Sequence, residues 1–371
     1  MIAQEITNSI NFGGVYQKKQ RDSNLELYRI IVMFAIVAHH YVVNSGLMTS
    51  INEGNALATN SLFLLLFGCW GKIGINCFVL ITGYFMCKSN ITPRKFLKLF
   101  LEWMFYKYFI YAIFTLSGYQ PFSVKDLIKA IIPFMSLTDG FTSCFIVFFL
   151  FIPFLNILIR NLNEIRHRCL LFLVLGVYSV LAMLPFMNIG SSYVFWFMAL
   201  YFVASYIRLY PISLYENTKF WGLLSFAAVI CSFASVIFMA YMKDNVGLYM
   251  GFYYFLADSN KITALAVSVV FFMFFKNIKV KYHPFINKVA ASTFGVLLIH
   301  ANSDTMRQWL WRDICNNVGF FDSPYLVFHA FGVVIFVFVV CIVIDWLRIR
   351  FIERPVFNWL GRFEWINKEI Y

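Results

Sequence analysis

The stretch NLELYRIIVMFAIVAHHYV, residues 24–42, is an apolar run with few ionisable side chains, and similar runs recur along the whole chain. There are about ten of them, each about 18–25 residues long, the length that crosses the hydrocarbon core of a bilayer as an α-helix. Helices hydrogen-bond their own backbone there, and the short alternating segments of a membrane barrel are absent. The sequence therefore predicts an all-α, polytopic membrane protein.

The composition agrees with this prediction, because 61% of the residues are hydrophobic and only 13% are charged. A soluble domain carries about 25% charged residues. We expect an N-terminal segment at 1–24, a membrane domain at 25–350 and a C-terminal tail at 351–371. The predicted spans lie near residues 25–45, 62–87, 96–117, 141–160, 168–187, 193–209, 219–242, 258–275, 286–303 and 325–347.

The basic residues predict the orientation of the chain in the membrane. Most of the 30 Lys and Arg residues fall at the helix ends of one side, together with both termini. By the positive-inside rule this side is cytoplasmic, so both termini are predicted there. The net charge of +12 does not indicate a nucleic-acid partner, because the basic residues form no single patch. The eight scattered cysteines have no C-x-x-C spacing, so no metal site is predicted.

The first run places two ionisable side chains on one helical face. Arg29 and His40 are eleven residues apart, which is only about 20° more than three full helical turns, whereas His39 points about 80° away from Arg29. His40 lies roughly 16 Å deeper in the membrane than Arg29. A cation at the cytoplasmic boundary and an imidazole deeper on the same face suit coenzyme A, with its phosphates on Arg29 and its thioester at His40. Histidine is also a natural general base for a hydroxyl acceptor.

The residues alone leave other interpretations open. An intramembrane histidine often serves only as a hydrogen-bonding group between helices, and an arginine at a helix end often only sets topology. A transporter or flippase for a lipid-linked or anionic solute would share the span count. Transporters often consist of two related halves, and the two halves of this chain are not similar, which weakens that alternative.

The spacing Arg29-x10-His40 resembles the signature of the integral-membrane acyltransferase-3 family. Further segments resemble family segments in the same order, whereas FTSCF (141–145) departs from the Trp-Phe pair expected there. The agreeing segments are GINCFVLITGYFM (74–86), PRKFLKLF (93–100), LFIPFLNILI (150–159), WFMALYFVASYIRLYP (196–211), FGVLLIH (294–300) and FIERP (351–355).

The resemblance implies transfer of an acyl group, commonly acetyl, from cytosolic acyl-CoA to a hydroxyl of a surface or exported glycan or a lipid-linked sugar. It implies His40 and Arg29 as catalytic residues, while direct transfer and a covalent acyl-histidine both remain open. Acetyl-CoA would be a donor substrate and not a resident cofactor, and the protein would lie in a bacterial cytoplasmic membrane. The donor's phosphates would bind at Arg29, Arg94, Lys95 and Lys98, and the acceptor at Lys72 and His300.

Further expectations concern five residues. Lys72 and Lys107 interrupt apolar spans, and Lys72 would bind acceptor, stabilise an oxyanion or extend to the outer surface. Asp345 lies three residues before Arg348, the spacing of a helical ion pair. Pro355 is expected to end the last helix.

Overall fold

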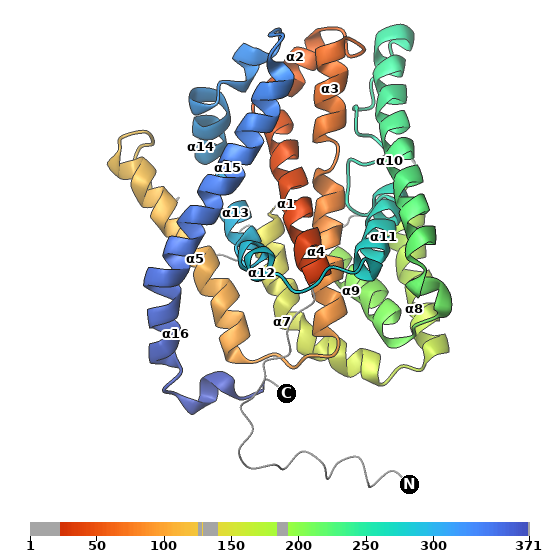
Figure 1. Ribbon diagram of the computed structural model, residues 1–371, viewed down its shortest axis with the longest axis vertical. Helices are drawn as coiled ribbons and strands as arrows, with labels where there is room; N and C mark the ends of the chain where they lie inside the picture. The colour runs from red at the N-terminus through yellow and green to blue at the C-terminus, as the bar shows by residue number, and fades with distance from the viewer. Residues whose placement is uncertain (1–22, 125–127, 129–139, 184–191, 370–371) are drawn as a thin grey trace.

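A computed structural model describes residues 23–124, 128, 140–183 and 192–369 (Figure 1). In this part of the chain the regular structure is helical and contains no strand, which confirms the all-α prediction. The predicted N-terminal segment 1–24 lies almost wholly outside the described residues.

Several helices are preceded by a residue whose side chain accepts a backbone N–H of the first turn: Thr92, Asn163, Ser192, Asn217 and Ser303. The bounds are α1 Ser23–Val43, α2 Leu47–Glu53, α3 Thr59–Gly68, α4 Gly71–Met86, α5 Pro93–Leu116, α7 Phe141–Arg160, α8 Glu164–Leu175, α9 Tyr193–Leu209, α10 Thr218–Tyr241, α11 Ile262–Asn277, α12 Pro284–Ala290, α13 Thr293–His300, α14 Asp304–Gln308, α15 Leu326–Arg348 and α16 Arg354–Leu360. Short 3₁₀ or π turns lie between them, among them η6 Trp309–Ile314, η8 Ile349–Glu353 and η9 Glu364–Asn367.

Within the described residues, seven helical stretches are long and apolar enough to cross a bilayer, and a bent pair makes up to eight. The shorter apolar helices α9 and α11 lie where the sixth and eighth spans are predicted. The chain is thus a multi-pass membrane protein, and the number of ten crossings stays a prediction. The seven stretches are Ser23–Val43, Thr59–Met86, Pro93–Leu116, Phe141–Arg160, Glu164–Met183, Thr218–Val246 and Leu326–Leu360.

Two predicted spans are interrupted in the structure. The span at 62–87 consists of α3 and α4, which are separated at residues 69–70. The span at 286–303 consists of α12 and α13, and the chain then turns by 94° into Asp304–Phe320. Both interruptions bring polar residues toward the centre of the bundle, as described below.

The end of the last helix differs from the prediction. Pro355 does not stop it, because the chain continues through η8 into α16, where Pro355 occupies the first turn. Proline is tolerated there, since a first-turn N–H has no intrahelical acceptor to lose. The predicted boundary at residue 350 therefore falls within continuous helical chain.

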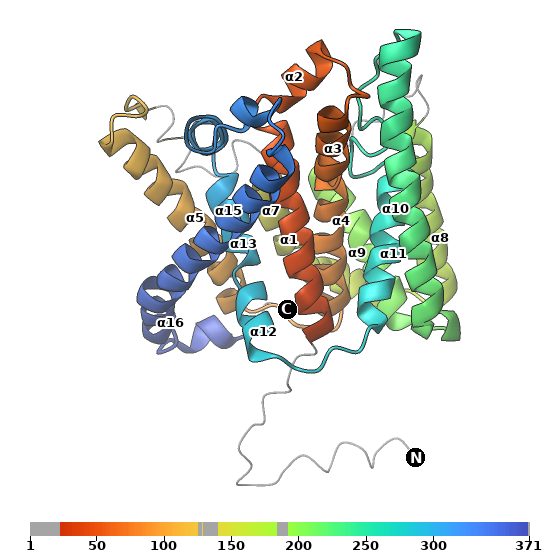
Figure 2. The same ribbon diagram turned by 45° about the horizontal axis from the view of Figure 1, so that its top comes forward.

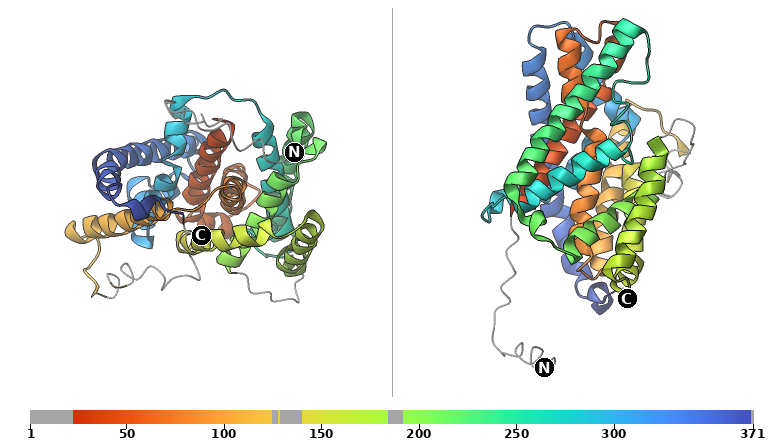
Figure 3. Two further views of the ribbon diagram at one scale, coloured as in Figure 1. Left: turned by 90° about the horizontal axis from the view of Figure 1, so that it is seen from below. Right: turned by 90° about the vertical axis from the view of Figure 1, so that its right-hand side faces the viewer.

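α1 occupies the centre of the bundle and contacts α3, α4, α11, α12, α13 and α15. Figures 2 and 3 show α8 and α10 along one edge, with α5, α15 and α16 along the opposite one. Large apolar side chains such as Phe226 of α10 and Phe328 of α15 are exposed on these outer helices, as expected of surfaces in contact with lipid. In Figure 2 the start of α1 and α16 both lie toward the lower end of the molecule.

A buried ion cluster fastens α5 to α15. Arg348 contacts Asp345 at 2.8 Å, Glu353 at 2.9 Å and Glu102 at 3.2 Å. The Tyr106 hydroxyl donates to Asp345 at 2.8 Å. The predicted ion pair between Asp345 and Arg348 is therefore confirmed, and it belongs to a larger cluster in which one arginine faces three carboxylates.

Candidate active site

A cavity of about 320 Å³ lies beside α1 in the middle of the bundle. Two histidines, His39 and His40, line it together with three cations, Lys72 of α4, Lys107 of α5 and Arg307 of α14. The other lining residues are Met33, Ile36, Gly71, Ile75, Phe78, Trp103, Gly140, Phe141, Thr142, Ser143, Tyr193, Phe294, Leu297, Leu298, Ala301 and Asn302.

His40 is held in one orientation by a second histidine. Its Nδ1 lies 3.0 Å from Nε2 of His300, and Nδ1 of His300 lies 2.6 Å from the carbonyl oxygen of Val296. A carbonyl only accepts, so in a neutral His300 ring Nδ1 carries the proton and Nε2 is the acceptor. His40 Nδ1 is then the donor, which leaves the lone pair on its Nε2 for the cavity.

His300 is predicted to contact the acceptor, and the structure instead places it behind His40. It is fully buried, is not among the residues lining the cavity, and packs edge-on against Trp311 at 6.3 Å between ring centres. His300 thus fixes the tautomer of His40. In metal sites and catalytic triads, a hydrogen-bond partner on the second ring nitrogen orients the imidazole in the same way.

His39 also lines the cavity, although the helical periodicity predicts that its side chain points about 80° away from that of Arg29. Its Nδ1 lies 2.5 Å from the carbonyl oxygen of Gly68, at the end of α3. Its ring fills the space that a side chain at Gly71 would need, since a Cβ there would lie 2.2 Å from His39 Cδ2. The cavity therefore spans a wider sector of α1 than the face shared by Arg29 and His40.

The three cations come from distant parts of the sequence. Lys72 donates from Nζ to the Tyr193 hydroxyl at 2.5 Å, so it points into the bundle and not to the outer surface. Arg307 pairs with Asp304 at 2.8 Å. Arg307 and Lys72 thus line the same cavity as the His40 imidazole. Only the 94° turn after α13 brings Arg307 to this place.

The cavity has an apolar end and a polar end. On α1, Met33 precedes His40 by seven residues, about 10 Å toward the start of the helix. α4 runs in the opposite direction (Figure 1), so Phe78 lies about 9 Å below Lys72, on the same side as Met33. Trp103 lies one turn before Lys107 in α5 and is also at this apolar end. The histidines and cations form the opposite end.

The beginning of α7 closes one wall of the cavity. Gly140, Phe141, Thr142 and Ser143 line it, and the helix has no side-chain cap at Gly140. The first amides of a helix have no intrahelical acceptor and carry partial positive charge. The segment FTSCF, which departs from the family pattern, thus forms a helix start that faces His40.

The predicted donor-binding cations lie outside the cavity, on two elements. Arg29 pairs with Glu26 at 3.1 Å on α1. At the start of α5, Arg94 lies over the Phe357 ring, Lys98 pairs with Glu353 at 2.8 Å, and Lys95 donates to Ser89 and Asn90, both at 2.6 Å. The α5 cations thus also fasten this helix to its neighbouring loop and to the C-terminal segment.

A family model described as an acyltransferase domain, that of acyltransferase-3, matches residues 22–346. The chain belongs to the acyltransferase-3 family. This acyltransferase matches no curated protein and no solved structure in the comparisons made. Family membership supports a membrane acyltransferase and does not by itself specify the donor, the acyl group or the acceptor.

Proposed function

We propose that this acyltransferase moves an acetyl group from cytosolic acetyl-CoA to a hydroxyl of a surface or exported glycan, or of its lipid-linked precursor, in a bacterial cytoplasmic membrane. The observation that carries the proposal is the arrangement of His40, which lines an internal cavity while His300 holds its Nδ1. A histidine oriented in this way presents one basic nitrogen to a substrate, as a general base requires.

In the proposed reaction, His40 Nε2 takes the proton of the acceptor hydroxyl. The hydroxyl oxygen attacks the thioester carbonyl carbon and forms a tetrahedral intermediate. The C–S bond then breaks, and the CoA thiolate leaves with the proton returned by His40. The products are an ester and the free thiol of CoA, so atoms and protons balance without another reactant.

The shape of the cavity supports a donor that enters from the cytoplasmic side. Its apolar end, with Met33, Phe78 and Trp103, suits the flexible, uncharged part of the CoA arm. Arg29 lies four residues before Met33, about one turn further toward the start of α1 on nearly the same face. We place the donor's phosphates there, with added positive charge from Arg94, Lys95 and Lys98 at the start of α5.

The beginning of α7 is the part of the cavity where we propose that the developing oxyanion is stabilised. Negative charge develops on the carbonyl oxygen during attack, and preorganised donors that meet it lower the barrier. Phe141, Thr142 and Ser143 line the cavity at the start of α7, and their first-turn backbone amides are the donors we propose for this oxygen.

The proposal is tested by transfer of radiolabelled acetyl groups from acetyl-CoA into the membrane glycan fraction. His40→Ala should lower the transfer rate by about 10²–10⁴-fold, the usual contribution of a general base. His283→Ala is the matched control, because His283 is exposed outside the cavity. Arg29→Gln should raise the KM for acetyl-CoA. Wild-type transfer that survives His40→Ala unchanged, or no transfer by the wild type, would refute the proposal.

A transporter or flippase remains the alternative that the sequence alone permits. The family match favours the enzyme, and nothing in the described residues specifically favours transport.

A further inference from the structure

The polar end of the cavity carries an excess of positive charge. Lys72, Lys107 and Arg307 line it, and among the described lining residues there is no aspartate or glutamate. Ionisable groups held within a membrane protein are costly unless they are paired or serve a ligand. In the described part of the lining, the ionisable side chains other than the histidines are therefore all basic.

The partners of two of these cations leave that charge largely uncompensated. Lys72 donates to a phenol, the neutral hydroxyl group of Tyr193. Arg307 pairs through Nη1 with Asp304, whose side chain is 97% exposed, so water screens the pair strongly. Nε of Arg307 is buried without a hydrogen-bond partner. A buried donor of this kind is satisfied when an acceptor binds next to it.

The donor does not account for these cations under the proposed function. Its charged groups are the phosphates, which the apolar lining of Met33, Phe78 and Trp103 separates from the polar end. The part of the donor that reaches His40 is the thioester, which is uncharged. The positive end of the cavity thus remains for the second substrate.

From this arrangement we infer that the acceptor is an anionic sugar, whose carboxylate or phosphate binds to Lys72 and Arg307 while its hydroxyl faces His40. The whole cavity, of about 320 Å³, is near the lower limit of ligand pockets and also has to hold the end of the donor, so its polar end suits a single acidic residue and not a length of polymer. The inference rests on the proposed function and specifies its acceptor.

The test is binding of small sugars by the purified full-length protein in detergent, without CoA, measured by the rise in melting temperature. The probes are glucuronate, glucose 1-phosphate and the neutral sugar glucose. We expect at least one of the acids to stabilise the protein and glucose not to do so. Stabilisation by glucuronate alone would identify a carboxylate sugar, and stabilisation by glucose 1-phosphate alone a phosphate-bearing one.

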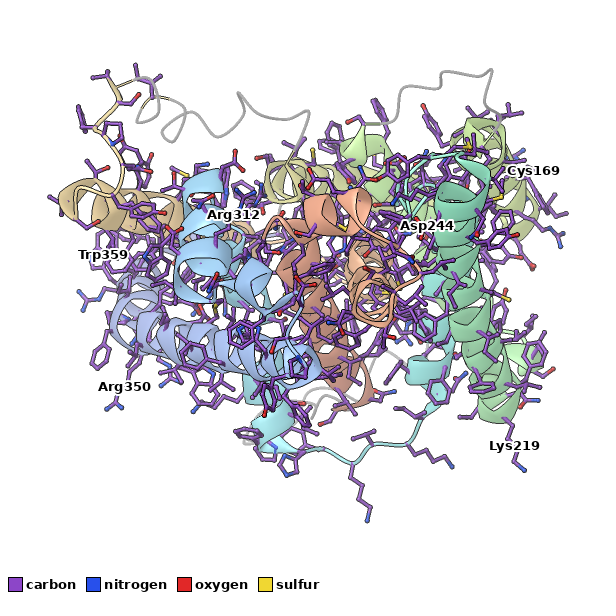
Figure 4. The ribbon with its side chains drawn as sticks, turned by 90° about the horizontal axis from the view of Figure 1, so that it is seen from above. Cys169, Lys219, Asp244, Arg312, Arg350 and Trp359 are labelled. Carbon is purple, nitrogen blue, oxygen red and sulfur yellow. The ribbon has the colours of Figure 1, made fainter. Side chains whose placement is uncertain are left out.

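Two substitutions assign the binding to this cavity. Each of the single substitutions Arg307→Gln and Lys72→Gln should raise the Kd for the acid by at least about tenfold, which corresponds to about 1.4 kcal/mol of binding free energy. Arg312→Gln is the matched control. Arg312, labelled in Figure 4, follows five residues after Arg307, but it lines a separate hollow with Ser45 and Thr49. Its substitution should leave the Kd unchanged.

The outcomes separate this inference from the proposed function. Three results would each overturn the anionic acceptor. Glucose and the acids could stabilise the protein equally, none of them could stabilise it, or the Arg307→Gln and Arg312→Gln proteins could have equal Kd values for the acid. If such a protein still transferred acetyl groups through His40, the proposed function would stand. Acid binding without any acetyl transfer would instead refute the proposed function.

Discussion

Replacing Gly71 by alanine places a methyl group against the His39 ring. The new Cβ would lie 2.2 Å from Cδ2 and 2.5 Å from Nε2 of His39, whereas ordinary contacts begin at 3.4 Å. The ring must therefore move by about 1.2 Å relative to α4. Because His39 Nδ1 is held 2.5 Å from the Gly68 oxygen, a movement of that size away from Gly68 would break this hydrogen bond. Overpacking of this kind costs about 1–3 kcal/mol.

The displaced ring also disturbs the cavity, which His39 and His40 line side by side. A misplacement of about 1 Å in an active site lowers the rate by up to about 10²-fold. We therefore expect Gly71→Ala to lower both the melting temperature and the rate of acetyl transfer at saturating acetyl-CoA, by about 10–100-fold for the rate.

Gly332→Ala is the matched control for this prediction. Gly332 lies in α15, and a Cβ added there would meet no atom within 4 Å. Alanine at an open helical position should stabilise the protein slightly, by up to about 1 kcal/mol. If the Gly71→Ala and Gly332→Ala proteins melted and transferred acetyl groups alike, the close packing of His39 on Gly71, and the reasoning built on it, would be wrong.

Two further predictions concern buried polar contacts. His300→Leu should lower kcat by about 10–100-fold, because His40 loses the acceptor that fixes its tautomer, whereas His300→Gln, which keeps an acceptor, should retain more activity; equal loss in both variants would contradict the positioning role. Arg348→Met leaves three carboxylates without their shared cation and should destabilise the protein by about 3–5 kcal/mol. Lys98→Met removes a cation that is 52% exposed and should cost only about 0–1 kcal/mol, so similar melting temperatures for these two variants would show that the cluster contributes little.

The sequence predicted the fold class and most helices well, because both depend on local properties. An apolar run of sufficient length must form a helix in a bilayer, whatever its neighbours are. The predicted span at 141–160 matches α7 in both bounds, and the pair Asp345 and Arg348 forms as its spacing indicates. His40 and Lys72, chosen as ionisable residues within apolar runs, both line the central cavity.

The interruptions of two spans were not visible in the sequence. Both broken spans contain apolar residues on either side of the break, so their composition still predicts one continuous helix. α3 and α4 separate at residues 69–70, and Gly71, the first residue after this break, lies against the His39 ring of α1. The prediction for Pro355 was also wrong: it was expected to end a helix, but it occupies the first turn of α16.

The sequence by itself determined that this protein is an all-α membrane protein and that Arg29 and His40 share a helical face, since hydropathy and helical periodicity are properties of the chain alone. Only the tertiary structure decided which residues surround His40. It placed His300 behind His40 and brought Arg307 to the same cavity from the segment after α13. Contacts between residues hundreds of positions apart depend on how the helices bend and pack, and no local pattern records that geometry.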